Sequence, residues 1–196
     1  MPDLVRPVLT GDAFFAGEQP VLHGQGLTLR PWRPGDAPAL VRAYSDPALQ
    51  QWHMRSMTPR ETPVWIGDRS RRWRERTGVD WAVCDDAGLV LGRIAFHRFV
   101  LHEGLGEIAY WVLPEARGRR LAPRALEVVC SWAFGRGLHR IELGHAVANQ
   151  ASCRVAQRAG FTLEGVRRQE LLHADGWHDT HLHARLASDP VPASVD

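Results

Sequence analysis

The stretch GEIAYWVLPEARGRRLAPRALEVVCSWA, residues 106–133, decides the fold of this 196-residue chain. Its first part, Glu107–Leu113, is rich in apolar, aromatic and β-branched residues and ends at Pro114, which predicts a strand. In its second part, apolar residues recur at the spacing of one helix face, at Ala122, Leu126, Val129, Cys130 and Ala133. Pro123 falls in the first turn of this helix, where its missing N–H costs nothing. The stretch therefore predicts a strand, a tight turn and an amphipathic helix.

The turn between that strand and that helix is basic. Arg117, Arg119 and Arg120 stand beside a helix start, whose first backbone N–H groups have no partner within the helix. The helix dipole adds partial positive charge at the same place. A phosphate group is the ligand that this combination favours. A solvated helix cap is the alternative interpretation of so short a pattern.

The turn resembles the pyrophosphate-binding turn of the GNAT acyltransferase superfamily, written Arg/Gln-x-x-Gly-x-Gly/Ala. Arg117 matches its first position and Ala122 its last, whereas Arg120 replaces the usual glycine. Residues 147–161 resemble the second half of the family, in which Asn and Ser open a helix and Gly-Phe ends it.

Three further segments resemble the Rim-type branch of that superfamily. They are residues 27–37, similar to its first strand and helix, and residues 163–165 together with 176–179, similar to its tail. The branch includes acetyltransferases that act on the N-termini of ribosomal proteins, together with relatives of other specificity. The resemblance extends from Leu27 to Leu186 in one order.

The composition restricts the classes of protein to which this chain can belong. The chain is 44% hydrophobic and 23% charged, which is typical of a globular domain. Its net charge of +2 argues against nucleic acid as the main partner. Cys84, Cys130 and Cys153 form no spaced pair, so we expect no disulfide framework and a reducing, cytoplasmic setting. No segment is apolar for long enough to cross a membrane.

The order of the predicted elements gives an α/β (α+β) fold. We expect residues 1–20 to be an N-terminal extension over the surface, residues 21–186 to be a single GNAT domain, and residues 187–196 to be a flexible tail. The domain should contain a mixed, mostly antiparallel twisted sheet of six to seven strands with about four helices. The strands are predicted at 21–30, 80–84, 89–100, 104–113, 140–146, 161–168 and 179–186, and the helices at 36–45, 62–78, 122–133 and 152–159.

The resemblance implies that acetyl-CoA is the acyl donor. The strands 106–113 and 140–146 would diverge at one end, and pantetheine would fill the slot between them. The cofactor-binding residues implied are Trp111, Val112 and Leu113 along the slot, Arg117, Gly118, Arg119, Arg120, Leu121 and Ala122 at the diphosphate, and Asn149, Ser152 and Arg154 at the second helix.

Two residues are the candidates for catalysis. Glu107 is the first choice for general base, because aromatic surface beside it would raise the pKa of its carboxyl group. Glu170 and His145 are lower choices. Ser152 would bind or protonate the departing thiolate, with plain N-capping of the helix as the alternative. Neither Tyr44 nor Tyr110 lies in the helix after Asn149, where many GNAT enzymes have their tyrosine acid.

Several segments allow two interpretations. Residues 49–60, with Trp52 and His53, could line a substrate cleft or simply pack between helices. The arginines of residues 69–76 could form a solvated helix face or an acceptor-binding rim. Asp179, His181 and His183 share one strand face, but no cysteine or further carboxylate is spaced to complete a zinc shell, so we predict no metal.

The leading functional hypothesis is an acetyl-CoA-dependent N-acetyltransferase that transfers directly to a primary amine through a ternary complex. The acceptor could be a protein N-terminus, an antibiotic or other small amine, or a polyamine, and a homodimer is expected from the resemblance. The alternatives are a non-catalytic CoA-binding or regulatory module, an enzyme using a larger acyl-CoA, transfer through Cys153, and an arginine-based nucleic-acid binder.

Overall fold

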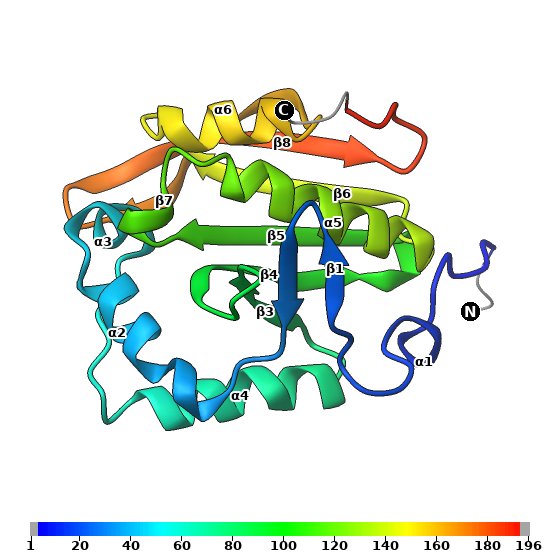
Figure 1. Cartoon of the computed structure of the whole chain (residues 1–196). Coiled ribbons are helices and arrows are strands. Elements are labelled where there is room, and N and C mark those ends of the chain that lie inside the picture. The colour runs from blue at the N-terminus through cyan, green and yellow to red at the C-terminus, as the bar shows by residue number, and fades with distance from the viewer. Residues whose placement is uncertain (1–3, 193–196) are drawn as a thin grey trace.

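The computed structural model describes residues 4–192, and in them an eight-stranded sheet carries helices on both faces (Figure 1). The spatial order of the strands is β1-β2-β3-β4-β5-β6-β8-β7. The strands are β1 (Leu22–Gly24), β2 (Leu27–Arg30), β3 (Val79–Cys84), β4 (Val90–Val100), β5 (Leu105–Val112), β6 (Arg140–Ala146), β7 (Thr162–His173) and β8 (Gly176–Leu186). The α-helices are α1 (Gly11–Phe14), α2 (Ala37–Ser45), α3 (Pro47–His53), α4 (Thr62–Arg74), α5 (Leu121–Gly135) and α6 (Gln150–Arg158). Short 3₁₀ turns precede α2 (Pro34–Asp36), β5 (Leu101–Glu103) and α5 (Pro114–Ala116).

The mixed, mostly antiparallel sheet is confirmed, but the predicted counts of strands and helices are too low. The single strand predicted at 21–30 is a hairpin of β1 and β2. Its two turn residues, Gln25 and Gly26, both have positive φ, at 54° and 62°, which is the geometry of a tight hairpin turn. The helices α1 and α3 are the elements missed, and each is only four to seven residues long.

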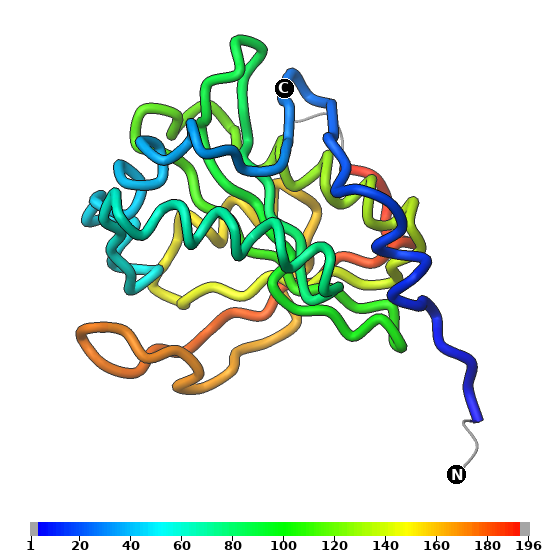
Figure 2. Tube along the Cα trace, turned by 90° about the horizontal axis from the view of Figure 1, so that it is seen from below, coloured from blue at the N-terminus to red at the C-terminus, as the bar shows by residue number. Residues whose placement is uncertain are grey.

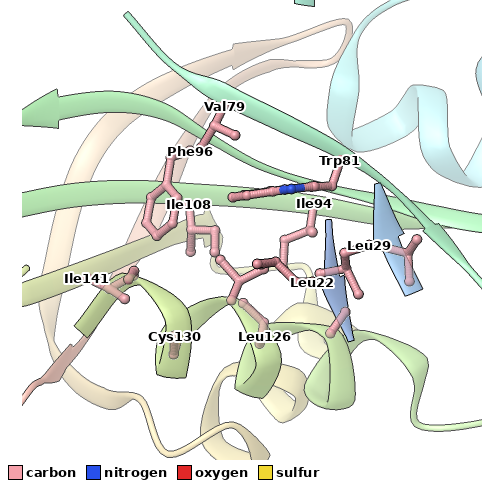
Figure 3. Close-up of a cluster of buried hydrophobic side chains, with 14 of the residues drawn as sticks. Leu22, Leu29, Val79, Trp81, Ile94, Phe96, Ile108, Leu126, Cys130 and Ile141 are labelled. Carbon is pink, nitrogen blue, oxygen red and sulfur yellow. The ribbon is translucent and has the colours of Figure 1, made fainter. Parts of the chain in front are cut away.

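Apolar side chains from alternate strand positions fill both faces of the sheet. On the face covered by α5, the strands and the helix meet in one large cluster (Figure 3), with Leu29, Trp81, Ile94, Phe96, Ile108 and Ile141 opposite Leu126 and Cys130. On the other face, Ala82 and Cys84 join a second cluster with residues of α2, α3 and α4. All six residues of β3 are buried, because this central strand is covered on both sides.

The segment before β1 is more than a surface extension. Phe14 and Phe15 are buried in the large cluster, and Phe14 contacts Trp132 of α5 with 5.3 Å between ring centroids. Trp73 of α4 donates a hydrogen bond to the carbonyl oxygen of Gly17 over 2.9 Å. The expectation that residues 1–20 only cover the surface is therefore wrong for these aromatic residues. Residues 1–3 and, of the predicted tail, residues 193–196 lie outside the described part of the chain.

A buried ion pair joins β3 to β4 on the α4 side of the sheet. Asp80 is 1% exposed, and it accepts hydrogen bonds from the guanidinium group of Arg93 over 2.9 and 3.0 Å. The indole N–H of Trp32 donates to the same carboxylate over 2.8 Å. Several donors therefore satisfy this buried charge, as a charge removed from water requires.

The strands β5 and β6 run parallel but pair only at one end. Leu105 lies opposite Arg140, Gly106 opposite Ile141, and Glu107 opposite Glu142. Beyond these residues no further pairs join the two strands, which confirms the predicted divergence between 106–113 and 140–146. Backbone groups along the rest of β5 and β6 consequently face a gap within the sheet.

Candidate active site

A cavity of about 520 Å³ opens between the diverging strands. Its walls come from β5 and β6, the turn before α5, the first residues of α5 and α6, helix α3 and strand β7. Of the twelve residues assigned to the cofactor from the sequence, all but Leu113 and Arg119 line it. The lining members of that set are Trp111, Val112, Arg117, Gly118, Arg120, Leu121, Ala122, Asn149, Ser152 and Arg154.

The backbone of the basic turn explains why glycine suits its fourth position. Arg120 occupies the N-cap of α5 with φ 53°, in the left-handed region that residues with a Cβ rarely adopt. Gly118 also has positive φ, at 76°. The chain thus reaches the helix start through two left-handed residues, and the first N–H groups of α5, at Leu121 and Ala122, have no intrahelical acceptor. Arg120 keeps this geometry and adds a cation to it.

The charge around the cavity is of one sign. Four of its lining residues are arginines, namely Arg117, Arg120, Arg154 and Arg158, and none of its described lining residues is Asp or Glu. Arg117 forms an ion pair with Asp46, the residue that caps α3. The pair fixes the turn to the start of α3, while the excess positive charge favours an anionic ligand.

Along β5, the backbone groups of successive residues point alternately toward β4 and toward the side of β6. Leu113 donates its N–H to Leu91 of β4 over 2.9 Å, and its carbonyl oxygen accepts from Ala116 over 2.9 Å. Both groups of Leu113 are occupied and its side chain is fully buried, so this residue is a structural one rather than part of the slot. Because alternate residues along a strand direct their backbone to the same side, Val112 and Tyr110 turn theirs toward the gap.

A hydrogen bond within the cavity joins β5 to α6. The phenol of Tyr110 and the hydroxyl of Ser152 lie 2.9 Å apart, and both residues line the cavity. Burial raises the pKa of Tyr110 to about 12, so the phenol keeps its proton at neutral pH. The sequence argument missed Tyr110 because it sought a tyrosine on the second helix, whereas this one comes from the strand.

Asn149, and not Ser152, caps α6. The side-chain oxygen of Asn149 accepts a hydrogen bond from the backbone N–H of Ser152 over 3.0 Å. Ser152 is the third residue of the helix, so the N-capping alternative for its hydroxyl is wrong. That hydroxyl is directed instead to Tyr110 and the cavity.

Glu107 does not have the surroundings expected of a general base. Its carboxylate lies 3.4 Å from a ring nitrogen of His97 and 3.6 Å from the guanidinium group of Arg98. The hydrogen bond from His97 and the nearby charge of Arg98 lower the pKa of Glu107, although burial opposes them. The expected rise in pKa is therefore wrong, and Glu107 is not among the residues that line the cavity.

The two lower candidates for the base also have structural partners. Glu170 is exposed and accepts a hydrogen bond from Arg167 over 2.8 Å. His145 is 5% exposed, lines the cavity wall, and directs its Nδ1 to the carbonyl oxygen of Ala146 over 2.8 Å. None of the arginines of α4 lines the cavity: Arg71 pairs with Asp68 in solvent, whereas Arg69 packs over Trp65 and is only 17% exposed.

The far end of the cavity is neutral and aromatic. Trp52 and His53 of α3 line it together with Leu171 and His173 of β7, and the rings of Trp52 and His173 are 5.8 Å apart. Burial and the charge of Arg93 lower the pKa of His53 to about 4, so its ring is neutral at physiological pH. The β7–β8 hairpin, coloured orange, extends from the body of the molecule beside α3 (Figure 2). Of residues 49–60, Leu49, Trp52 and His53 therefore do line a cleft.

The sequence profile of the acetyltransferase (GNAT) domain family matches residues 26–162, which is more than half of the chain and includes both sides of the gap. The chain belongs to the GNAT acetyltransferase family. GNAT acetyltransferases use acetyl-CoA as the donor, and this GNAT chain is accordingly an N-acetyltransferase with an amine as acceptor.

Relatives of this GNAT domain include bacterial ribosomal-protein enzymes. The chain is 27% identical to the uncharacterized N-acetyltransferase YoaA of Bacillus subtilis over 84% of its own length and 96% of YoaA. It is 32% identical to the ribosomal-protein-serine acetyltransferase of Escherichia coli, over 50% of this chain and 55% of that protein. The fold is also that of RimL, a ribosomal-protein acetyltransferase solved in complex with coenzyme A, with a TM-score of 0.78 at 22% identity, covering 85% and 98% of the two chains.

In the described residues of this GNAT domain no helix is both long and apolar enough to span a bilayer. The polar cavity-lining residues that the sequence missed are Tyr110, Arg158 and His173. Tyr110 did have a signal in the sequence. Neighbouring residues of a strand point to opposite faces of the sheet, so Tyr110 faces the α5 side while Trp111 faces the α3 side. His173 had none, since only the β7–β8 pairing brings it to α3.

Proposed function

We propose that this protein acetylates a protein N-terminus by direct transfer from acetyl-CoA within a ternary complex. The observation that carries the proposal is the gap between β5 and β6, whose cavity is lined by the Tyr110–Ser152 hydroxyl pair and by four arginines. Direct transfer requires two substrates to be held in line, and a single cavity lined by the arginines of the basic turn and α6 and by residues of α3 and β7 supports that arrangement.

Acetyl-CoA would enter this cavity as an additional strand. Its pantetheine would hydrogen-bond to backbone groups of Tyr110 and Val112 that β6 leaves unpaired. Its diphosphate would accept from the amides of residues 118–122 and from Arg120. Arg154 and Arg158 on α6 supply further positive charge on the same side.

The reaction then needs little more than the groups at the gap. The nitrogen of the amine attacks the thioester carbonyl, a backbone N–H of β5 stabilises the oxyanion, and the C–S bond breaks as the amide forms. Ser152 donates a hydrogen bond to the departing thiolate, and Tyr110 donates to the oxygen of Ser152. The amine loses its proton to solvent water, and the thiolate gains one in the same way.

The acceptor would approach between α3 and β7. The neutral ring of His53 accepts a hydrogen bond from the amine and, unlike a cation, does not repel it. Trp52 and Leu171 offer apolar surface for the first side chains of a peptide. The ribosomal-protein acetyltransferases among the relatives support a protein N-terminus over a small amine. Such an acceptor would agree with the predicted cytoplasmic setting, and the homodimer stays a prediction.

A mass-shift assay with acetyl-CoA tests the proposal. Peptides with the N-terminal sequences of ribosomal proteins should gain one acetyl group, while aminoglycosides and polyamines should react at least about tenfold more slowly. Initial-rate lines that intersect would support the ternary complex. A stable acetyl adduct on Cys153, which does not line the cavity, would contradict it. Tight binding of acetyl-CoA with no turnover on any amine would favour a non-catalytic module.

A further inference from the structure

Four metal-binding side chains meet behind the wall of the cavity. They are His145 on β6, Cys153 on α6, and His181 and His183 on β8. One ligand atom of each, a ring nitrogen or the sulfur, lies within 4.8 Å of all the others. His145 and His183 are almost fully buried, at 5% and 0% exposed, and the other two are half-buried. Three imidazoles and a thiol are thus enclosed between one helix and two strands.

The distances within this His/Cys cluster are close to those of a tetrahedral shell. Nε2 of His145 lies 3.1 Å from Nε2 of His183, and Sγ of Cys153 lies 4.0 Å from the same Nε2 of His183. A tetrahedral zinc ion with bonds of about 2.0–2.3 Å keeps its nitrogen and sulfur ligands about 3.3–3.6 Å apart. Small side-chain rotations would bring these atoms to that spacing.

The hydrogen bonds of the cluster prepare His145 to bind a cation. Its Nδ1 lies 2.8 Å from the carbonyl oxygen of Ala146, which can only accept, so Nδ1 carries the proton of the neutral ring. The lone pair of Nε2 then faces His183. A backbone carbonyl that fixes the tautomer in this way is the usual outer partner of a metal-bound histidine.

The described residues leave other nitrogens of the cluster unsatisfied. Nδ1 of His181 and Nδ1 of His183 are buried and have no hydrogen-bond partner among them. A buried polar atom without a partner costs about 1–3 kcal/mol. Because no hydrogen bond among the described residues occupies Nδ1, this nitrogen can carry the ring proton and leave Nε2, which in His183 faces His145 and Cys153, to bind an ion.

We propose that His145, Cys153, His181 and His183 bind one zinc ion. Three imidazoles and one thiolate are a donor set that suits zinc among the divalent metals, and four protein ligands are the mark of a structural site. Binding forms three Zn–N bonds and one Zn–S bond, and the thiol of Cys153 releases its proton to solvent.

The ion would attach the start of α6 to β6 and β8. Cys153 follows Ser152 directly, and His145 contributes to the cavity wall, so the metal lies behind the hydroxyl pair without entering the cavity. Its role is to hold the helix at the distance that Tyr110 requires. Any effect of the ion on turnover through Tyr110 and Ser152 rests on the proposed function, whereas the binding of the metal does not.

The sequence analysis predicted no metal because no cysteine is spaced near His181 and His183. Cys153 reaches them from α6, thirty residues earlier in the chain. Asp179, which was grouped with these histidines, is not part of the cluster, and its carboxylate accepts from the backbone N–H of Gln169 over 2.9 Å. Only the packing of α6 on β8 brings Cys153 to these histidines.

Metal titration of the full-length chain tests the site. After removal of metal with a chelator, Zn²⁺ should bind with one equivalent per chain, measured by competition with a chromophoric chelator. Co²⁺ should give the thiolate-to-cobalt charge-transfer absorption of a tetrahedral site. Cys153→Ser should weaken zinc binding at least about 100-fold and abolish that absorption. The matched control Cys84→Ser, which changes another buried cysteine on the opposite face, should retain both.

A second variant decides the question if Cys153→Ser does not fold. His181→Gln alters a half-buried ligand and should weaken binding at least about tenfold while circular dichroism stays that of the wild type. Zinc should also raise the melting temperature of the wild type but not that of either ligand variant. The proposal is overturned if the folded wild type binds less than about 0.1 equivalent of zinc, or if both ligand variants bind it as the wild type does.

Discussion

The phenolic oxygen of Tyr110 lies 2.9 Å from the hydroxyl oxygen of Ser152, although 42 residues separate them in the chain. One residue belongs to a strand and the other to the first turn of a helix across the gap. Tyr110 lies three residues beyond Glu107, the last residue of β5 that pairs with β6, and both hydroxyls line the cavity. Its chemistry can be tested directly.

Removing either hydroxyl should slow turnover more than it weakens binding. We expect Ser152→Ala to lower kcat about 100-fold and Tyr110→Phe about tenfold, with KM for acetyl-CoA changed less than threefold. The double variant should be no slower than Ser152→Ala alone, because the two hydroxyls act as a unit. Steady-state kinetics measure these values. Additive losses would show that Tyr110 acts independently of Ser152.

Glu107→Gln should leave catalysis nearly unchanged. The carboxylate lies outside the cavity and is occupied by His97 and Arg98, so we expect kcat to fall by less than about threefold. The pH dependence of kcat/KM should keep its shape. A loss of 100-fold or more, with the basic limb of the profile removed, would restore Glu107 as the general base.

Arg120→Gly should separate backbone strain from charge. Glycine adopts the left-handed conformation without cost, so unfolding should require about 0.5–1 kcal/mol more than in the wild type. The lost cation should raise KM for acetyl-CoA several-fold. Thermal melts and kinetics measure the two effects. As the opposite control, Gly118→Ala at φ 76° should destabilise by about 1 kcal/mol, and a gain there would refute the argument from φ.

The stability of the protein should fall as the pH is lowered from about 6.5 to about 4. His53 titrates at about 4 in the folded state and at about 6.5 when unfolded, so the unfolded chain takes up the proton first. The loss from this one group is at most about 3 kcal/mol, and it is complete only below pH 4. Chemical denaturation at several pH values measures it. His53→Gln should flatten the curve in this window, and an equally steep curve would assign the effect to other groups.

Asp80→Asn should be among the most damaging single substitutions. It leaves the buried guanidinium group of Arg93 without a counter-charge, which costs about 3–5 kcal/mol. Denaturant unfolding measures the change. The control is Glu115→Gln, which removes an exposed ion pair with Arg42, 3.6 Å long and half in solvent, and should cost less than about 1 kcal/mol. Equal effects of the two changes would contradict the role of burial.

Local patterns predicted most of the strands because they need only short-range information. The alternation and β-branched residues of Val79–Cys84 and Leu105–Val112 mark strands wherever they lie. The first hairpin was missed because Gln25 at its turn is not a residue that signals positive φ. The helix α3 was missed because seven residues hold too few helical repeats to form a pattern.

The candidate site was likewise only partly determined by the sequence. The residues of the basic turn and of the helix start that follows it are continuous in the chain, so the sequence by itself determined the basic end of the cavity and, with it, the family. The partners of each side chain are not continuous. Only the tertiary structure decided that Tyr110 meets Ser152, that Glu107 meets His97 and Arg98, and that Cys153 meets His183. The reason is physical: a pKa, a hydroxyl pair or a metal shell depends on distances of a few ångströms between segments, and these are fixed only when the helices pack on the sheet.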